Sequence, residues 1–228
     1  MPITLTQYLQ KVRFYLRDYY AVAYQQQDLI DCINQARANI VSDSFVNRAL
    51  VTGLYTTANQ YTYTYAQVLQ QLQTQIPLAS SVVFINSIAV YWSATLKPTL
   101  DYMEWTDLNA IFLSFLSFTF IPSVWGEYAP LTSFVLAPIP NAAYQLEVDC
   151  CYLPNTLVNP NDTDLLPATI ADLELVPFEA CRLAKIHQNS HGESMRFDAL
   201  YQRAFERRFS GYPSHRVASR YGTDVRSP

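Results

Sequence analysis

The sequence has little charge, little glycine and no phosphate-binding loop. Only 15% of its 228 residues are charged, against about 25% in an average soluble domain, so uncharged residues must cover much of the folded surface. The five glycines are scattered at positions 53, 126, 192, 211 and 222. This spacing excludes the Rossmann and P-loop classes of nucleotide-binding protein, which need clustered glycines.

Paired cysteines, a signal peptide and a membrane-spanning run are also missing. No C-x-x-C spacing occurs, and we expect buried, reduced thiols in a protein assembled in a cytoplasm; the four cysteines are Cys32, Cys150, Cys151 and Cys181. Three basic residues interrupt the first 17 positions, so we expect no signal peptide. The most apolar segment, residues 111–121, is far shorter than the ~20 residues of a spanning helix. We therefore expect no membrane association.

Arginine and tyrosine are abundant where lysine is scarce. The chain has 17 tyrosines, and only three of its 15 basic residues are lysine. Protein interfaces are enriched in Arg and Tyr and depleted in Lys. The composition therefore favours a subunit whose sides pack against other chains, and a low-charge monomer is the alternative.

Helical periodicity marks both ends of the chain. Apolar residues recur at helical spacing over residues 4–20 and again over 28–44, where Asp31, Arg37 and Asp43 lie off the apolar stripe. The period returns around Pro177, at a first-turn position, and over residues 194–210, followed by Gly211. We expect these helices to pack together.

The middle of the chain has strand character. Residues 61–65 alternate strictly, residues 66–75 fit a short helical or irregular piece, and a helix opened by Thr106 is expected over 107–117. We expect Trp105 and Trp125 to fill the core and the helix to pack on the sheet through Phe112, Phe115 and Phe118. β-branched and aromatic residues predict further strands, at 81–92, 95–103, 123–129, 133–138 and 143–153.

These patterns predict an α+β fold, in which a helical bundle formed by both chain ends carries an inserted antiparallel β-rich module. We expect the N-terminal helices of the bundle in residues 1–55, the β-rich insertion in 56–160, and the C-terminal helices in 161–211. Residues 212–228 form an extended basic arm in this interpretation, because they have three arginines, one acid and no apolar periodicity.

Catalytic and metal-binding patterns are incomplete. His187 and His191 are four residues apart, as in metalloprotease helices, but Gln188 replaces the glutamate base. The acidic group Asp162, Asp164, Asp172 and Glu174 lacks the glycine and terminal glutamate of a calcium loop, so we interpret it as a solvated turn. We expect no catalytic residue, metal or cofactor. A metal-dependent hydrolase is the remote alternative.

The charge balance argues against tight nucleic-acid binding. The net charge is −4, whereas phosphate-driven binders are basic. From residue 194 onward seven arginines face three acids, so the end of the chain is basic and the preceding body is acidic. We expect the basic end to meet an acidic protein surface.

Two stretches carry a family resemblance. The first is LIDCINQARANIVSDS (29–44). The second begins at LKPTLDYMEWTDLNAIF (96–112) and continues through IPSVWGEYAP, residues 135–157 and LLPATIADLELVPFEACRLA (165–184). In this order they resemble the head-to-tail adaptor (connector or head completion) proteins of tailed bacteriophages. One departure is Ala129, where the family pattern often has glycine.

The resemblance implies a non-enzymatic virion protein located in the neck and assembled in the host cytoplasm. It implies a homo-oligomeric ring, usually of twelve copies, between the portal protein and the tail or nozzle proteins. DNA would pass through its channel without sequence-specific binding, and an acidic wall suits that passage.

Candidate contact residues follow from this interpretation. The portal-docking arm would use Arg216, Arg220, Tyr221 and Arg226, and the tail-facing candidates are Tyr61, Tyr63 and Tyr65. The competing class is a β-sandwich binding module of a tail fibre or baseplate, for which an exposed patch from the same three tyrosines would be the mark.

Overall fold

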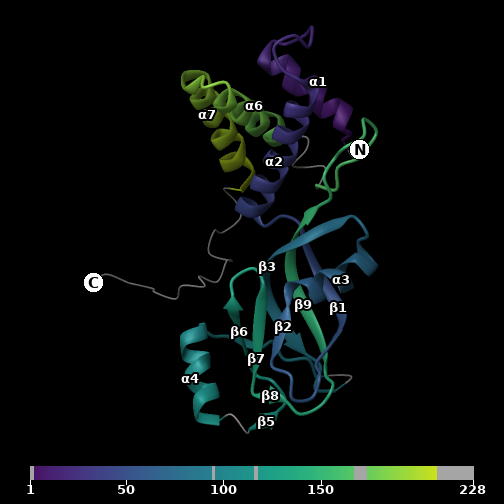
Figure 1. The fold of residues 1–228 in the computed structure, drawn as a ribbon, viewed down its shortest axis with the longest axis vertical. Helices are drawn as coiled ribbons and strands as arrows, with labels where there is room; N and C mark the ends of the chain where they lie inside the picture. The colour runs from purple at the N-terminus through teal and green to yellow at the C-terminus, as the bar shows by residue number, and fades with distance from the viewer. Residues whose placement is uncertain (1–2, 94–95, 116–117, 167–173, 210–228) are drawn as a thin grey trace, which may run out of the picture. The chain divides into compact units, whose positions relative to one another are not determined.

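The computed structural model describes residues 3–93, 96–115, 118–166 and 174–209 (Figure 1). The chain forms two compact units. A helical unit comprises the described residues of 1–47 and 154–216, and a β unit those of 48–153. The expected α+β class is confirmed, because helices from both chain ends pack together and the β-sheets are inserted between them in the sequence.

The helical unit is built on one central helix. This helix is α6 (Leu175–His187). It packs against α1 (Leu5–Leu16), α2 (Gln26–Ser44) and α7 (His191–Phe209), so it lies between α2 and α7. α1 begins at Thr4, whose hydroxyl accepts from the Gln7 backbone N–H while the Gln7 side chain accepts from the Thr4 N–H. The four predicted helices are confirmed with these bounds: α1 (Leu5–Leu16), α2 (Gln26–Ser44), α6 (Leu175–His187) and α7 (His191–Phe209).

The β unit contains three small sheets and two helices. The sheet orders are β1-β9-β3, β2-β7-β6-β4 and β5-β8. The pairs β1–β9, β2–β7 and β6–β7 are antiparallel, whereas the short pairs β4–β6 and β5–β8 are parallel. The elements are β1 (Arg48–Tyr55), β2 (Thr62–Thr64), α3 (Tyr65–Gln75), β3 (Ala79–Val90), β4 (Asp101–Tyr102), α4 (Trp105–Phe115), β5 (Thr119–Phe120), β6 (Val124–Ala129), β7 (Ser133–Ala137), β8 (Ile139–Pro140) and β9 (Gln145–Pro154).

Two apolar cores stabilise the β unit. In the larger core, Val68 and Leu72 of α3 pack with residues of β1, β3 and β9. The smaller core joins Leu108 and Phe112 of α4 to Val135 of β7. Trp125 is buried, as predicted, whereas Trp105 is half-buried at the edge of the smaller core.

The structure corrects the expected strands in two places. β1 was not expected, because Gly53, with φ of +89°, breaks the apolar alternation at a register shift between Val51 and Leu54. The expected strand over 95–103 is present only in part: in its described residues, Val90 donates to the Pro98 carbonyl at 3.1 Å and Leu100 to the Ile88 carbonyl at 2.8 Å, before β4 turns to pair with β6. Pro98 lacks an N–H for a longer ladder.

Glycine is required where β4 approaches β6. A Cβ at Gly126 would collide with the Met103 carbonyl oxygen, and the Met103 N–H donates to the Trp125 carbonyl at 2.9 Å. The glycine therefore allows the close backbone approach of the parallel pair. In the described part of the chain, no helix has the length and apolarity needed to cross a membrane.

Candidate interaction surfaces

A buried ion pair fixes the segment that returns from the β unit to the helices. Arg37 of α2 donates to Asp164 Oδ1 from Nη2 at 2.7 Å and from Nε at 3.1 Å. Tyr8 of α1 donates to Asp164 Oδ2 at 2.7 Å, and the Leu166 N–H donates to Oδ1 at 3.0 Å. The two charged side chains are 3% and 0% exposed. The pair therefore joins α1, α2 and the 154–166 segment.

This pair corrects two expectations. Arg37 was expected off the apolar face of α2 and is instead buried, and Asp164 was expected in a solvated turn. Of the other acidic residues, Asp162 accepts the N–H groups of Val158 and Asn159, which hold the pKa of its carboxyl below the usual value. Glu174 accepts from the Tyr15 hydroxyl, and Asp172 lies outside the described residues.

Two further expectations concerned metal ligands and thiols. His187 ends α6 and His191 begins α7, so the two do not share one helix as expected. Among the described residues no group of three or more His, Cys, Asp or Glu side chains is placed to hold a metal ion. All four cysteines are buried, as predicted. Burial raises the pKa of Cys32 to about 11 and that of Cys150 to about 12, so neither thiol is activated.

A groove runs along the outer side of α2. Asn34 forms its edge by pairing with the Leu157 backbone, donating to the carbonyl at 3.0 Å and accepting from the N–H at 2.9 Å. These two hydrogen bonds hold the segment 156–158 beside α2. We call this feature the α2 groove, and its lining residues are Gln27, Ile30, Asp31, Asn34, Gln35, Ala38, Thr156, Leu157 and Val158.

The turn between α1 and α2 presents aromatic residues to solvent. Asp18, itself buried, accepts the N–H groups of Val22 and Ala23 at 2.9 and 3.1 Å and pairs with Arg13 at 2.9 Å. Burial alone would raise the pKa of this carboxyl, but these hydrogen bonds and Arg13 hold it below the usual value. The turn therefore holds Tyr20, 90% exposed, and Tyr19 away from the core.

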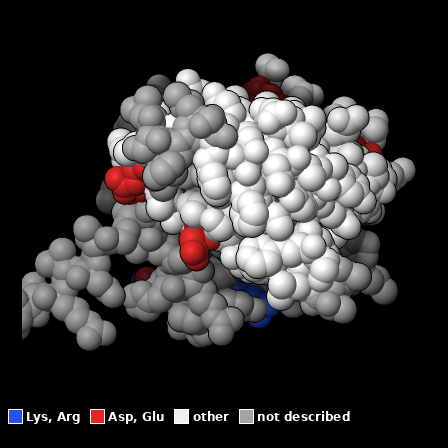
Figure 2. Space-filling model, turned by 90° about the horizontal axis from the view of Figure 1, so that it is seen from below, with Lys and Arg blue, Asp and Glu red and all other residues white. Residues whose placement is uncertain are grey.

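One end of the β unit forms an aromatic surface with few charges. Gln145 pairs with Tyr55 and accepts the Tyr91 N–H, while Pro140 pairs with Phe120 and accepts the Asn59 N–H. These contacts bring the chain around residues 55–59, 91, 120 and 140–145 to the same end of the β unit. Figure 2 views the molecule from below, and the described atoms visible there are mostly uncharged. We call this end the distal surface, and its exposed large side chains are Tyr55, Tyr61, Trp92, Leu96, Phe118 and Phe120.

The three tyrosines predicted to face the tail have different environments. Tyr61 is 43% exposed, and its ring contacts Phe112 with centroids 5.1 Å apart. Tyr63 is 1% exposed; its hydroxyl donates to the Gln60 carbonyl at 3.0 Å and accepts the Thr57 N–H at 3.1 Å. Tyr65 is buried at the start of α3 and donates to Glu127. The expectation of an exposed aromatic row is corrected, because only Tyr61 is exposed.

The expected phenylalanine face of α4 is present only in part. Phe112 is buried against the β7 strand, as predicted, whereas Phe118 is exposed and stacks on Phe120 with ring centroids 6.1 Å apart. The side chain of Phe115 lies outside the described part of the structure. The candidate arm residues Arg216, Arg220, Tyr221 and Arg226 also lie outside the described residues.

Comparison with known proteins gives one family. No match was found among curated proteins. A family model described as SU10 adaptor protein matches residues 3–228, which is nearly the whole chain. That match spans both units and agrees with the head-to-tail adaptor resemblance of the sequence. The chain therefore belongs to the SU10 adaptor protein family, and it is a phage adaptor protein.

Proposed function

We propose that this chain is a non-enzymatic structural protein of the virion neck, forming a closed ring of twelve copies between the portal vertex and the tail. The observation that carries the proposal is the match to the SU10 adaptor family over residues 3–228. The ring continues the channel through which DNA leaves the head. Its partners are the portal protein on one side and tail or nozzle proteins on the other.

The distribution of charge supports this division of contacts. Residues 48–153 hold only two basic residues, Arg48 and Lys97, and these pair with Asp149 and Glu147. Four more acids leave the β unit negative, which suits a wall past which DNA moves without being held. The distal surface, with few charges, suits contact with tail proteins, because large exposed apolar patches mark interaction sites.

The basic C-terminal arm is the proposed portal-docking element. Arg216, Arg220 and Arg226 supply positive charge, and Tyr221 adds an aromatic anchor of the kind enriched in interfaces. One exposed ion pair contributes only ~0.2 to 1 kcal/mol. Twelve arms presented together bind with much higher avidity than one.

The tail-facing contact is proposed for Tyr61 together with Phe118 and Phe120. All three are exposed, whereas Tyr63 and Tyr65 are buried and hydrogen-bonded within the β unit.

Imaging of the particle neck tests the proposed function. The expected result is a closed ring of this chain between the portal and the first tail component. An isolated copy, a two-fold dimer, or a location in a tail fibre or baseplate would overturn it; the last result would support the binding-module alternative.

Removal of residues 212–228 tests the arm separately. The truncated chain is expected to fold normally, as shown by circular dichroism, but to fail to attach to portal-bearing heads. Normal attachment of the truncated chain would show that the arm is not the docking element.

A further inference from the structure

The outer face of α7 carries a row of arginines. α7 packs on α6 through Ser194, Phe197 and Tyr201, and its opposite side is exposed. Arg196, Arg203 and Arg207 are spaced by seven and four residues, so they lie along one side of the helix. We call them the α7 arginine face. The adjacent exposed stripe contains Ala199 and Met195, which is 72% exposed.

These arginines are available for an intermolecular contact. Within the described part of the chain, Arg203 and Arg207 form no ion pair, whereas Arg182 on α6 binds Glu179 and Asp198. Of the carboxylates on α7, Asp198 is bound by Arg182 and Glu193 by Lys185, both of α6, whereas the exposed Glu206 lies beside Arg207 on the same helix. A long basic face of this kind needs an acidic partner to form a stable interface.

The α2 groove has the complementary character. Gln27, Asp31 and Gln35 form its exposed rim at four-residue spacing, and Gln27 donates to Asp31 at 2.9 Å. Asp28 stands next to this rim and is also exposed. None of the described residues that line the groove is basic, and its apolar lining includes the exposed Val158 beside the buried Ile30 and Leu157. The groove thus offers carboxylates at the rim and apolar area within.

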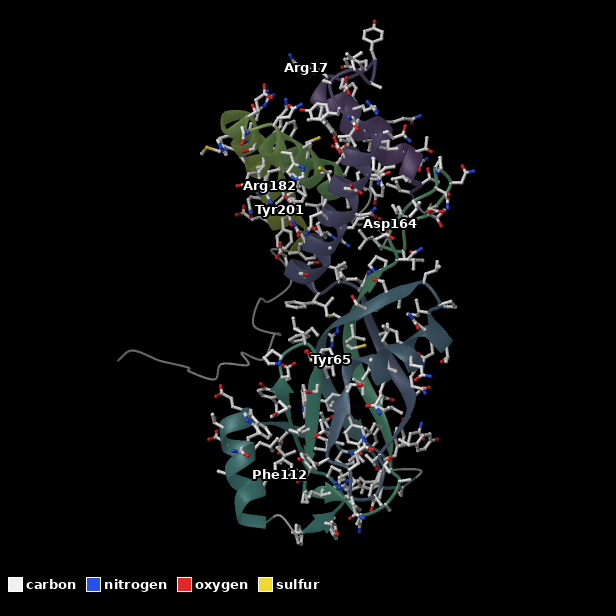
Figure 3. The ribbon with its side chains drawn as sticks, viewed as in Figure 1. Arg17, Tyr65, Phe112, Asp164, Arg182 and Tyr201 are labelled. Atoms are coloured by element: carbon white, nitrogen blue, oxygen red, sulfur yellow. The ribbon has the colours of Figure 1, made fainter. Side chains whose placement is uncertain are left out.

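The two surfaces lie on different sides of the helical unit. α6 lies between α2 and α7, and Figure 1 shows α7 on the left of this unit and the 155–163 segment on the right. Figure 3 places Arg182 and Tyr201 on the α7 side and Asp164 on the other. Two different faces on opposite sides are what a head-to-tail contact needs, and such contacts close into a ring when the rotation permits.

We propose that adjacent copies of this chain join by seating the α7 arginine face of one copy in the α2 groove of the next. Arg203 and Arg207 are one helical turn apart, as are Asp28 and Asp31, so two pairs form along parallel or antiparallel helices. Met195 and Ala199 supply the apolar filling beside them. The proposal rests on the proposed function only in requiring a ring of copies.

A charge exchange tests this contact directly. Arg203→Glu and Asp31→Arg are made singly and together, and each is added to portal-bearing heads that lack the adaptor. Lys11→Glu on α1 is the matched control, since it changes the charge by the same amount outside both faces. Each single variant is expected to reduce the number of heads carrying a closed ring at least ~10-fold, since like charges then meet at every interface. The double variant is expected to restore rings, and the control to assemble normally.

The outcomes separate this inference from the proposed function. If the unmodified chain forms no ring, the proposed function fails and this contact fails with it. If that chain forms rings and the single variants do so equally well, only the contact is overturned. The contact is also overturned if the single variants form no rings and the double variant does not restore them, provided that circular dichroism shows all variants to be folded.

Cross-linking supplies a second test that does not depend on charge. Because all four native cysteines are buried, a thiol-specific cross-linker will react with introduced surface cysteines. Rings of the Arg203→Cys, Gln35→Cys chain are expected to give a ladder of multimers, and those of an Arg203→Cys, Gln10→Cys control to give none. If the ladder forms instead with Arg220→Cys and Gln35→Cys, the basic arm occupies the groove and the α7 contact is overturned.

Discussion

The helical unit and the β unit are stabilised by different means. The helical unit buries Asp18, Arg37, Asp164 and Glu179, each held by hydrogen bonds or ion pairs, which for Arg37, Asp164 and Glu179 join separate segments. Among its described residues, the β unit buries no charged side chain and packs aromatic and aliphatic groups around Trp125. Buried ion pairs are intolerant of losing one partner, whereas apolar cores respond to lost volume. The two units should therefore differ in their sensitivity to charge and pH.

The largest expected effect is that of Asp164→Asn. The substitution leaves the buried Arg37 guanidinium without its counterion, at a cost of about 3–5 kcal/mol in the free energy of unfolding. All three tryptophans, Trp92, Trp105 and Trp125, lie in the β unit. The urea midpoint of unfolding should therefore fall more when it is measured by far-UV circular dichroism than when it is measured by tryptophan fluorescence. Equal shifts of both signals would contradict separate stabilisation, and the exposed Asp28→Asn serves as the control.

A smaller effect is expected for Asp18→Asn, and it should depend on pH. The pKa of Asp18 is lowered in the folded chain, so its stabilisation is present above the unfolded pKa of about 4 and is lost as the pH falls through the folded pKa. The variant should lose about 1–3 kcal/mol at neutral pH, and the difference from the unmodified chain should shrink in acid. Urea titrations at about pH 7 and about pH 3 measure this. A pH-independent difference would exclude the carboxylate as its origin; the exposed Asp31→Asn is the control.

In the β unit, Tyr63→Phe removes a buried hydroxyl that makes two hydrogen bonds. We expect the free energy of unfolding, followed by tryptophan fluorescence, to fall by about 1–2 kcal/mol. This difference should change little at low pH. Tyr55→Phe, on the exposed surface of the same unit, should have no measurable effect. An equal loss in both variants would show that the Tyr63 hydrogen bonds do not stabilise the unit.

The smallest stability change is expected for Tyr61→Asp, which should alter the free energy of unfolding by no more than about 0.5 kcal/mol, as is usual for surface positions. It should nevertheless reduce the number of heads that acquire tails while leaving ring assembly intact. Leu78→Asp is a matched control, because Leu78 is 44% exposed in the same unit but is not part of the distal surface. Heads that carry the Tyr61→Asp ring and complete tails would remove Tyr61 from the tail contact.

The helices could be predicted from the sequence because their signals are local. Thr4 and Thr64 begin α1 and α3 with side-chain caps that act over three residues, and the apolar stripes follow from spacing alone. The same holds for strands with clear β-branched runs, such as β3. β1 could not be predicted, because its bulge at Gly53 depends on its partner β9.

The candidate surfaces were less predictable because exposure is a property of tertiary packing. Alternation predicts Tyr61 and Tyr63 on one side of a strand, but Tyr61 lies just outside β2 and contacts Phe112, whereas Tyr63 is buried in the larger core. The position of Arg37 carries a sequence signal for burial, because it lies between Ile33, Ala36 and Ile40 on the buried face of α2. A charged residue so placed needs a buried partner, and Asp164 is far away in the sequence.

Within its described residues the chain passes between the units twice, and this has a mechanical consequence. The crossings lie at the start of β1 and the end of β9, two neighbouring antiparallel strands, with Arg48 opposite Cys151. A force that separates the units therefore pulls both strands in the same direction along their axes. The resistance comes from the hydrogen bonds between β9 and β3 and from α3 packed on β1, which are loaded together in shear rather than opened one at a time. The β unit is thereby anchored against tension by its longest strands.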